Sequence, residues 1–143
     1  MAITQAMASS FKPELMQALH NFTTSTGNVF KIALYTSAAT LSAATTAYTA
    51  TNEVASGGGY TTGGNTLTNV TPTLDGTTGI TDFADTTWTS STITARGALI
   101  YNSTNSNRAV AILDFGADKS SSSGDFTIVF PVAAAATAII RIA

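Results

Sequence analysis

The sequence predicts a mainly β protein, an antiparallel β-sandwich or jelly roll of seven to eight strands with one N-terminal amphipathic helix. Apolar and polar residues alternate over several short segments, turn-forming residues separate these segments, and the strand–helix–strand rhythm of a parallel sheet is missing. A chain of 143 residues that is 44% apolar can bury a core of its own. We expect an N-terminal arm over residues 1–9 and a single domain over 10–143.

The predicted helix follows Ser9 and Ser10, either of which can cap it. Pro13 suits a first helical turn, and Glu14 complements the positive end of the helix dipole. Apolar residues at spacings of three and four then form one stripe: Phe11, Leu15, Ala18, Leu19 and Phe22. A helix of about a dozen residues is marginal alone, so we expect its stripe to dock on the chain's own sheet or on a neighbouring subunit.

A hairpin spanning Arg96 to Gly116 is predicted to be the centre of the fold. Its two arms alternate with a period of two and could lie over a buried layer, with Leu113 among the residues facing it. The all-polar run from Asn102 to Asn107 joins the arms, because Asn tolerates positive φ and hydroxyl side chains bond their own backbone.

The same alternation predicts strands over Val29–Thr36, Thr66–Leu74, Phe126–Phe130 and Ala138–Ile142. Pro72 demotes the second of these to a sheet edge, and Asp75-Gly76 predicts a turn after it. The segment Ile80–Trp88 alternates weakly and is expected to be an irregular or bulged strand. Between these strands, Ser37–Gly64 is a long polar stretch with room for a short strand near Thr46–Thr51; a loop of that length is normally functional or packed against a partner.

Composition narrows the function classes. Only 10% of the residues are charged and the net charge is −2, so neither nucleic acid nor an anionic membrane is an expected partner. A surface so poor in charge is weakly protected against association, which favours packing into an assembly. The chain has no cysteine, which excludes disulfides and zinc–thiolate sites. No signal-peptide pattern or long apolar run appears, so we expect a soluble protein that is made in the cytosol.

Candidate chemical groups are few. His20 is the only histidine and is interpreted as a residue on the helix face, with no metal assigned to it because one imidazole is a weak ligand set. Asp82 and Asp85, with Asp75 nearby, form the densest acidic cluster. Paired carboxylates could serve a glycosidase or a calcium site, but capping of turns and bulges by Asp is the commoner use.

Motifs of nucleophilic catalysis and phosphate binding are missing. No Gly-x-Ser-x-Gly elbow occurs, and the glycines between Gly57 and Gly64 lack the lysine and the strand-to-helix setting of a phosphate loop. We therefore expect no catalytic residues, no cofactor and no enzyme. Arg96 and Arg141 lie on apolar strands, where each either pairs with an Asp or anchors an interface.

Several segments together resemble small virion proteins of tailed bacteriophages: 30–37 (FKIALYTS), 52–54 (NEV), 58–60 (GGY), 96–102 (RGALIYN) and 109–116 (AVAILDFG). The likeness covers roughly residues 10 to 143 and lies in the order of these segments. It implies a structural protein of the phage particle, made in the host cytoplasm. Capsid cement or decoration proteins, often trimeric, are the commonest type implied, and tail, baseplate or head-to-tail components are less common.

The sequence therefore predicts a cement protein on the outside of the capsid, a homo-oligomer with a trimer preferred, bound to the major capsid protein. Expected interface residues come from the helix stripe, the long loop and the two strand arginines: Phe11, Leu15, Tyr48, Tyr60, Arg96 and Arg141. The long loop is expected to become ordered through neighbouring subunits. The alternative from another class is a carbohydrate-binding jelly roll that uses exposed Tyr48, Tyr60 or Trp88 as a stacking platform.

Overall fold

The computed structural model describes residues 2–143, and the chain is mainly β. Ten strands and one short helix occur in this range, and all strand pairs are antiparallel. The largest sheet has the order β1 (Ala6–Met7), β8 (Arg108–Ser120), β7 (Thr94–Asn102), β2 (Phe30–Tyr35) and β3 (Asn65–Thr66). A second sheet contains β10 (Ile140–Ile142), β5 (Thr78–Phe83) and β4 (Asn69–Asp75), and a third pairs β6 (Thr86–Ser91) with β9 (Gly124–Ile128).

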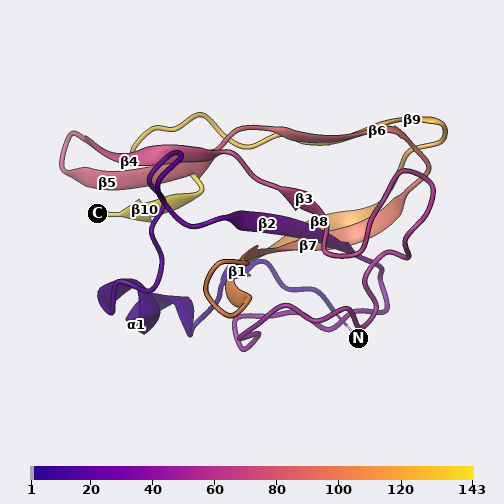
Figure 1. Ribbon diagram of the computed structural model, residues 1–143, viewed down its shortest axis with the longest axis horizontal. Helices are drawn as coiled ribbons and strands as arrows, with labels where there is room; N and C mark the ends of the chain where they lie inside the picture. The colour runs from indigo at the N-terminus through magenta and orange to yellow at the C-terminus, as the bar shows by residue number, and fades with distance from the viewer. Residues whose placement is uncertain (1) are drawn as a thin grey trace.

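The two small sheets lie in line along one side of the five-stranded sheet (Figure 1). β5 leads into β6 through Ala84 and Asp85 alone, so one long stretch of chain serves both small sheets. The arrangement is compatible with a β-sandwich, as expected. The strand count is higher than the predicted seven to eight because the 80–88 segment breaks into two strands, β3 separates from β4, and the N-terminal arm contributes β1.

The predicted central hairpin is confirmed as β7 and β8, the middle strands of the large sheet. Ser106 and Asn107 of the connecting turn have φ of 56° and 54°, the left-handed values that a polar run of this kind tolerates. Opposite Arg96, β8 bulges through residues 115–118 between two registered pairs, Gly97↔Asp114 and Ala95↔Lys119. Leu113 packs against the core, as expected, but its side chain is only half-buried, whereas Ile112 on the opposite face of β8 is fully buried.

The turn predicted at Asp75-Gly76 and the sheet edge predicted from Pro72 are both confirmed. Asp75 pairs with Thr78, and Gly76 between them has φ +62°. β4 is the edge strand of its sheet, and its register shifts between Val70 and Thr73, around Pro72. Pro72 has no N–H to donate, and an edge position with a bulge removes the need for one.

The helix is much shorter than predicted. α1 spans Phe11–Met16, six residues, and the chain then turns at Ala18, whose φ is 59°. Phe22, expected on the helix stripe, lies beyond the turn and stacks face to face on Phe30 at 4.3 Å between ring centroids. Burial of Phe22 in the sheet outweighs another helical turn, because a second turn adds little stability to a helix this short.

The core lies between the layers and is rich in aromatic side chains. At one end Phe22, Phe30, Phe83 and Phe130 contact one another, and at the other end Trp88 lies near Tyr60 and Phe126. Strands β2 and β7 are buried on both faces over most of their length, so another layer must cover the opposite side.

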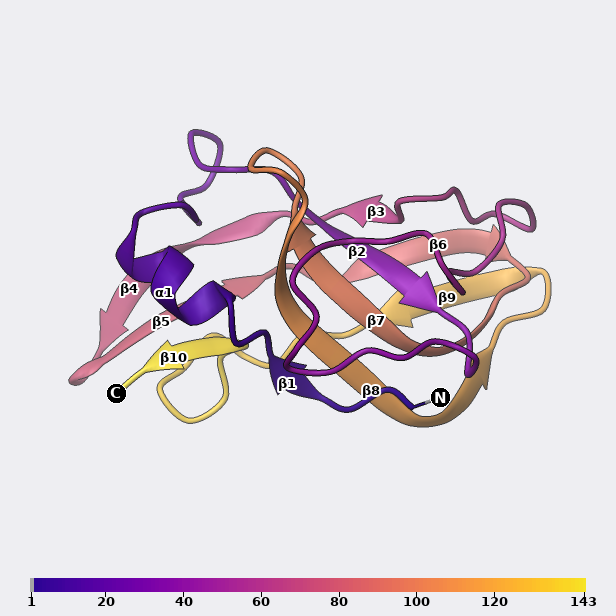
Figure 2. The same ribbon diagram turned by 90° about the horizontal axis from the view of Figure 1, so that it is seen from below.

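That cover is the 37–64 segment, which crosses the outer side of the large sheet (Figure 2). Backbone bridges tie it down at Leu41 to Ile3, Ala47 to Arg108 and Glu53 to Tyr35. The possible strand near 46–51 is reduced to the Ala47 bridge. These bridges order the segment on its own chain, and contacts between this segment and neighbouring subunits stay a prediction.

The N-terminal arm also packs on the domain. β1 pairs with β8 at Ile112 and Ala111, and Ala8 is fully buried. Of the predicted arm 1–9, Met1 lies outside the described residues. The rest of the arm contributes a strand to the large sheet.

Candidate functional site

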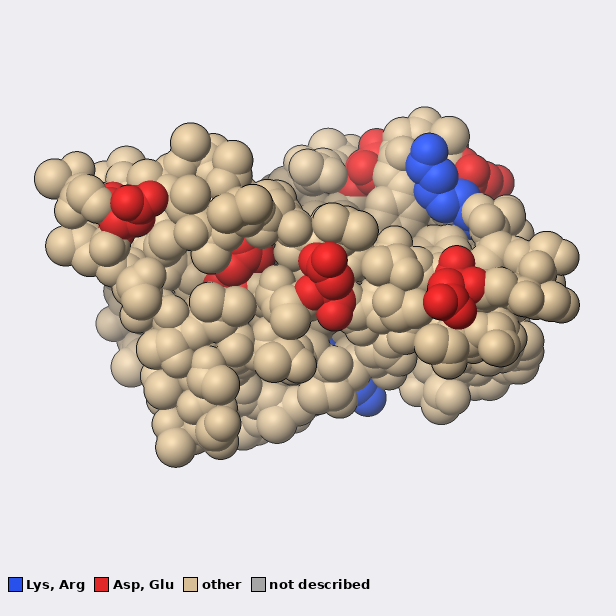
Figure 3. All heavy atoms as spheres, turned by 90° about the horizontal axis from the view of Figure 1, so that it is seen from above, with Lys and Arg blue, Asp and Glu red and all other residues tan. Residues whose placement is uncertain are grey.

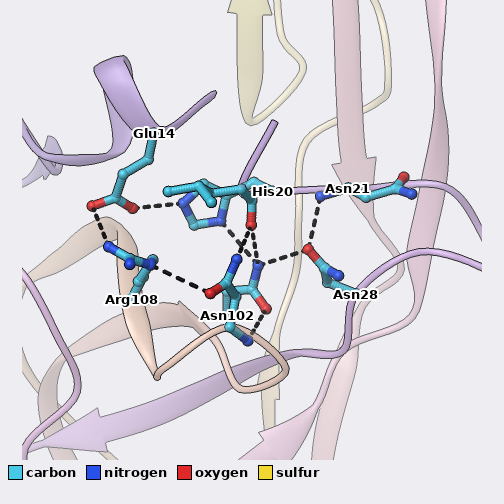
Figure 4. Close-up of polar contacts among 8 residues, drawn as sticks. Glu14, His20, Asn21, Asn28, Asn102 and Arg108 are labelled. Carbon is cyan, nitrogen blue, oxygen red and sulfur yellow. Dashed lines mark hydrogen bonds and ion pairs between the residues drawn. The ribbon is translucent and has the colours of Figure 1, made fainter. Parts of the chain in front are cut away.

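A buried polar cluster links α1 and the turn after it to the β7–β8 hairpin. We call it the His20 cluster, and its members are Glu14, His20, Asn102 and Arg108. Nε2 of His20 lies 2.8 Å from Oε2 of Glu14, and NH1 of Arg108 lies 3.5 Å from Oε1 of the same carboxylate. On the other side, Nδ2 of Asn102 lies 3.0 Å from Nδ1 of His20 (Figure 4). The left-handed turn at Ala18 makes this possible, because it directs His20 back under α1.

The hydrogen-bond directions fix the role of each group. The amide of Asn102 can only donate through Nδ2, so Nδ1 of His20 accepts and its ring proton resides on Nε2, which donates to Glu14. Nδ2 of Asn102 also donates to Oδ1 of Asn28 at 2.9 Å, and Oδ1 of Asn102 accepts from the backbone N–H of Asn105 at 3.1 Å.

This geometry leaves His20 no free nitrogen for a substrate. Its side chain is fully buried, both ring nitrogens are engaged, and Phe11 covers the ring at 4.8 Å. A general base needs a hydrogen-bond path to the proton it removes, and here each path ends at a carboxylate or an amide of the chain itself. What the cluster does is hold α1 and the following turn on the sheet.

Sequence reasoning placed His20 on a helix face and missed this cluster. The helix ends before His20, and Asn102 is 82 residues away in the chain, so no local spacing connects them. One signal in the sequence could have pointed to the cluster. The sole histidine and the asparagine-rich turn both lie next to strongly apolar segments, where a polar side chain needs a partner.

A second cluster, here called the tyrosine cluster, fastens the 37–64 segment to the sheet. The carboxylate of Glu53 accepts from the hydroxyls of Tyr48 at 2.7 Å and Tyr60 at 2.6 Å and from the backbone N–H of Gly63 at 2.7 Å. Tyr101 donates to the carbonyl of Gly63 at 2.7 Å and stacks on Tyr48 with ring centroids 4.6 Å apart. Gly64, which follows, has φ +76° and passes directly against the backbone of Ile32.

All four tyrosines of the chain belong to this region, and each is harder to ionise than a free phenol. Burial raises the pKa of Tyr101 to about 12, with the negative charge of Glu53 adding to the effect. Burial also raises the pKa of Tyr35, Tyr48 and Tyr60, and for Tyr48 and Tyr60 the hydrogen bond donated to Glu53 raises it further. These hydroxyls are donors to the carboxylate, and none is prepared to act as a nucleophile.

The acidic side chains singled out in the sequence bind backbone N–H groups. Oδ1 of Asp82 accepts from Phe83 at 2.8 Å, Oδ1 of Asp85 from Phe130 at 2.8 Å, and Oδ2 of Asp75 from Ala135 at 2.6 Å. Asp82 is buried, and burial raises its pKa. The contact of Asp82 is local, whereas Asp85 and Asp75 accept from residues 45 and 60 positions away in the chain, so the predicted capping of a nearby turn or bulge does not describe these two contacts. Within residues 2–143, no three acidic or histidine side chains converge as metal ligands.

The six predicted interface residues fall in different environments. Phe11 and Tyr60 are buried in the chain's own core, so neither reaches the surface and both predictions are corrected. Leu15 and Tyr48 are half-buried. Arg96 is 38% exposed and its Nε lies 3.6 Å from Oδ1 of Asp114, the Asp pairing that the sequence suggested. Arg141 is exposed and donates to the carbonyl of Ala135 at 3.3 Å.

Tyr48, Tyr60 and Trp88 do not form the exposed stacking platform for a carbohydrate that the sequence suggested. Tyr60 and Trp88 are 2% and 3% exposed, and the ring of Tyr48 is stacked against Tyr101. Buried rings cannot present a flat face to a sugar.

Among the grooves on the surface of the described residues, two lie beside the small sheets. The first, here called the β8–β9 groove, has a volume of about 530 Å³ and lies between the bulged half of β8 and strand β9. The second, about 380 Å³, is apolar and lies between α1 and the β4–β5–β10 sheet, with Leu15, Phe22, Ile80 and Ile140 in its lining. Leu74 and Ile142, which line it too, are 71% and 60% exposed.

Charge is sparse on the face that carries the two small sheets. Figure 3 shows acidic side chains set apart from one another on a largely uncharged surface, with basic atoms mainly towards one end. Such a face offers no continuous field of one sign.

No family model, no curated protein and no solved structure matches this chain. Among the described residues, α1 is the only helix, and no helix has the length and hydropathy needed to cross a bilayer.

Proposed function

We propose that this chain is a non-enzymatic structural protein of a tailed-bacteriophage particle, most specifically a cement or decoration protein bound to the major capsid protein on the outside of the shell. The proposal begins from the order of the segments around residues 30–37 and 96–116 and from the weakly charged composition. It places the protein in the virion as a homo-oligomer, with a trimer preferred from the resemblance.

The observation that carries the proposal is the exposure of large apolar side chains on a chain with so little charge. Val132 is 78% exposed, Val129 72%, Leu74 71% and Ile142 60%. Single exposed apolar residues are ordinary, but Leu74 and Ile142 line the apolar groove, and such a site on a sparsely charged surface favours association. Burial in an assembly would remove this surface from water, at about 25 cal/mol per Å².

The polar clusters support a structural role. In both the His20 cluster and the tyrosine cluster, the carboxylate is satisfied by donors of the same chain. Such closed networks stabilise a fold and specify its packing. We accordingly propose no catalytic residue and no cofactor, and we describe the finer architecture as a sandwich whose second layer is split into the two small sheets.

Purified virions provide the test. If the proposal is right, mass spectrometry of intact particles finds the protein, and its copy number relative to the major capsid protein reaches the hundreds expected of a cement protein. Presence at a few copies would place it in the tail, baseplate or head-to-tail connector instead. Absence from intact particles contradicts the proposal.

A further inference from the structure

We propose that the free edge of strand β9 is a self-association surface at which a second copy of this chain pairs antiparallel about a two-fold axis, extending β6–β9 into a four-stranded ribbon. The inference goes beyond the proposed function, since it names a self-association surface and predicts a dimer where the proposed function prefers a trimer. It begins with the walls of the β8–β9 groove.

One wall of this groove is a strand edge. Residues 125–129 are consecutive and all line the groove, although side chains of a strand point alternately to opposite faces. Five consecutive residues can border one groove only if the edge of the strand, with its backbone, forms the wall. The groove is therefore bordered by main-chain groups as well as by side chains.

Within residues 2–143, that edge has no partner strand. β9 pairs with β6 alone, so every second residue of β9 directs its backbone N–H and C=O away from the sheet. Natural edge strands are commonly blocked by Lys, Pro or an inward-pointing charge. β9 has the sequence Gly-Asp-Phe-Thr-Ile and none of these except the exposed Asp125 at one end. Val129, directly after it, is 72% exposed.

The charges in the groove select a second copy as the occupant. Lys119 and Asp125 both line it and both are exposed, and neither takes part in an ion pair within residues 2–143. Oδ1 of Asp125 accepts from the backbone N–H of Ser90 at 3.2 Å, and its charge has no cation opposite it within this range. A surface that carries one cation and one anion without ion-pair partners can be complementary to a second copy of itself. Under two-fold symmetry each contact occurs twice, so Lys119 can face Asp125 of the partner subunit while Asp125 faces Lys119 of the partner subunit.

The strand chemistry agrees with this choice. An extended segment adds to a sheet edge through backbone hydrogen bonds, and β9 is itself such a segment, available in every copy. The net charge of −2 leaves little repulsion between identical chains. A two-fold contact produces a dimer and not the three-fold ring preferred from the resemblance, so the two can be told apart by mass.

Charge reversal tests the proposal directly. We expect the purified protein to show a monomer–dimer equilibrium by sedimentation at concentrations up to roughly millimolar. At low salt, Lys119→Asp and Asp125→Lys should each weaken the dimer by roughly tenfold, because two symmetric contacts turn repulsive. The double variant should regain most of the wild-type affinity. Asp118→Lys and Lys12→Asp are matched controls, since they change the net charge equally outside the groove and should leave the affinity unchanged.

A cross-link locates the contact independently of charge. The chain has no cysteine, so one introduced thiol reports on one position. Thr127→Cys, at the exposed middle of β9, should give a disulfide-linked dimer under mild oxidation, whereas Thr73→Cys on the edge strand β4 should not. Circular dichroism confirms that each variant is folded.

The outcomes separate this inference from the proposed function. Three results would each overturn the β9 contact. The protein could stay monomeric at the highest concentration, or the double variant could fail to rescue the dimer that the single reversals weaken. The third such result is cross-linking through Thr73→Cys in preference to Thr127→Cys. A trimer insensitive to the charge reversals would do the same, yet would leave a role in the virion intact. Absence of the protein from virions would remove that role while leaving a measured β9 dimer unaffected.

Discussion

Nε2 of His20 donates to Oε2 of Glu14 across 2.8 Å, and this contact joins two residues that the sequence placed on one helix but the fold separates by a left-handed turn. The ring proton on Nε2 follows from the donor Asn102 at Nδ1. We expect ¹⁵N-detected NMR to show the Nε2–H tautomer of His20 at neutral pH. Observation of the Nδ1–H tautomer would contradict the hydrogen-bond directions of the whole cluster.

Asn102 is expected to be the most sensitive polar residue of the His20 cluster. Asn102→Ala should lower the free energy of unfolding by about 2–4 kcal/mol, because the buried His20 and the half-buried Asn28 and Asn105 each lose a partner. Urea denaturation measures the change. Asn21→Ala removes an exposed asparagine side chain and should cost less than about 1 kcal/mol; equal losses in the two variants would argue against a special role for the buried amide.

Alkaline pH should destabilise the protein through its tyrosines. In the unfolded chain a tyrosine ionises near pKa 10, whereas burial raises the pKa of Tyr101 to about 12 and that of the other three also upward. Between these values the unfolded state has lost protons that the folded state retains, so stability is fully present below pH 10 and falls as the pH rises through 10 to 12. Ultraviolet absorbance of tyrosinate should therefore rise together with loss of the β-sheet signal. A normal titration in the folded state would contradict the burial of these phenols.

Two neighbouring residues of strand β8 differ in how deeply they are buried. Ile112→Ala should cost about 2–5 kcal/mol, since its side chain is fully buried, and the half-buried Leu113→Ala should cost clearly less. Thermal or chemical denaturation of the two variants tests the register of β8. The reverse order would mean that the strand is shifted by one residue.

Two glycines with similar positive φ offer a matched pair. A Cβ at Gly64 (φ +76°) would overlap the carbonyl oxygen of Ile32, whereas a Cβ at Gly76 (φ +62°) would meet no atom within 4 Å. Gly76→Ala should cost only the left-handed conformation, about 1 kcal/mol. Gly64→Ala should cost at least about 3 kcal/mol, because the backbone beside β2 has to move. Equal denaturation midpoints for the two variants would show that the close approach of Gly64 to the backbone of Ile32 is not required.

Glu53 is expected to control the accessibility of the 37–64 segment. In the wild-type protein this segment should resist limited proteolysis even as a monomer, since its contacts are internal. Glu53→Ala removes the acceptor of two tyrosine hydroxyls and one backbone N–H and should open the segment to cleavage. Thr51→Ala, an exposed change in the same segment, is the control. Cleavage of the wild-type monomer in this segment would support the prediction that neighbouring copies order it.

The central hairpin, the turn at Asp75-Gly76 and the edge position of β4 could be predicted because each follows from local rules. Asp75-Gly76, Pro72 and the asparagine run after β7 each restrict the backbone of their own few residues, so their effect could be inferred without knowing the rest of the fold. The strand at 30–35 was equally evident from its alternation. By itself the sequence thus determined a mainly β, antiparallel chain centred on the β7–β8 hairpin.

Tertiary contacts decided the features that depend on residues far apart in the chain. The helix ends early because Phe22 gains more by stacking on Phe30 than by adding a turn to α1. His20 lies in a buried cluster because Asn102, on β7, supplies a donor. The 37–64 segment is held on the sheet by Tyr35 of β2 and Tyr101 of β7, which donate to the carbonyls of Thr49 and Gly63. The sequence contains these partners, but the free energy that brings them together comes from burying apolar side chains between the layers of the fold. That burial depends on residues far apart in the chain, so the spacing of neighbouring residues does not reveal it.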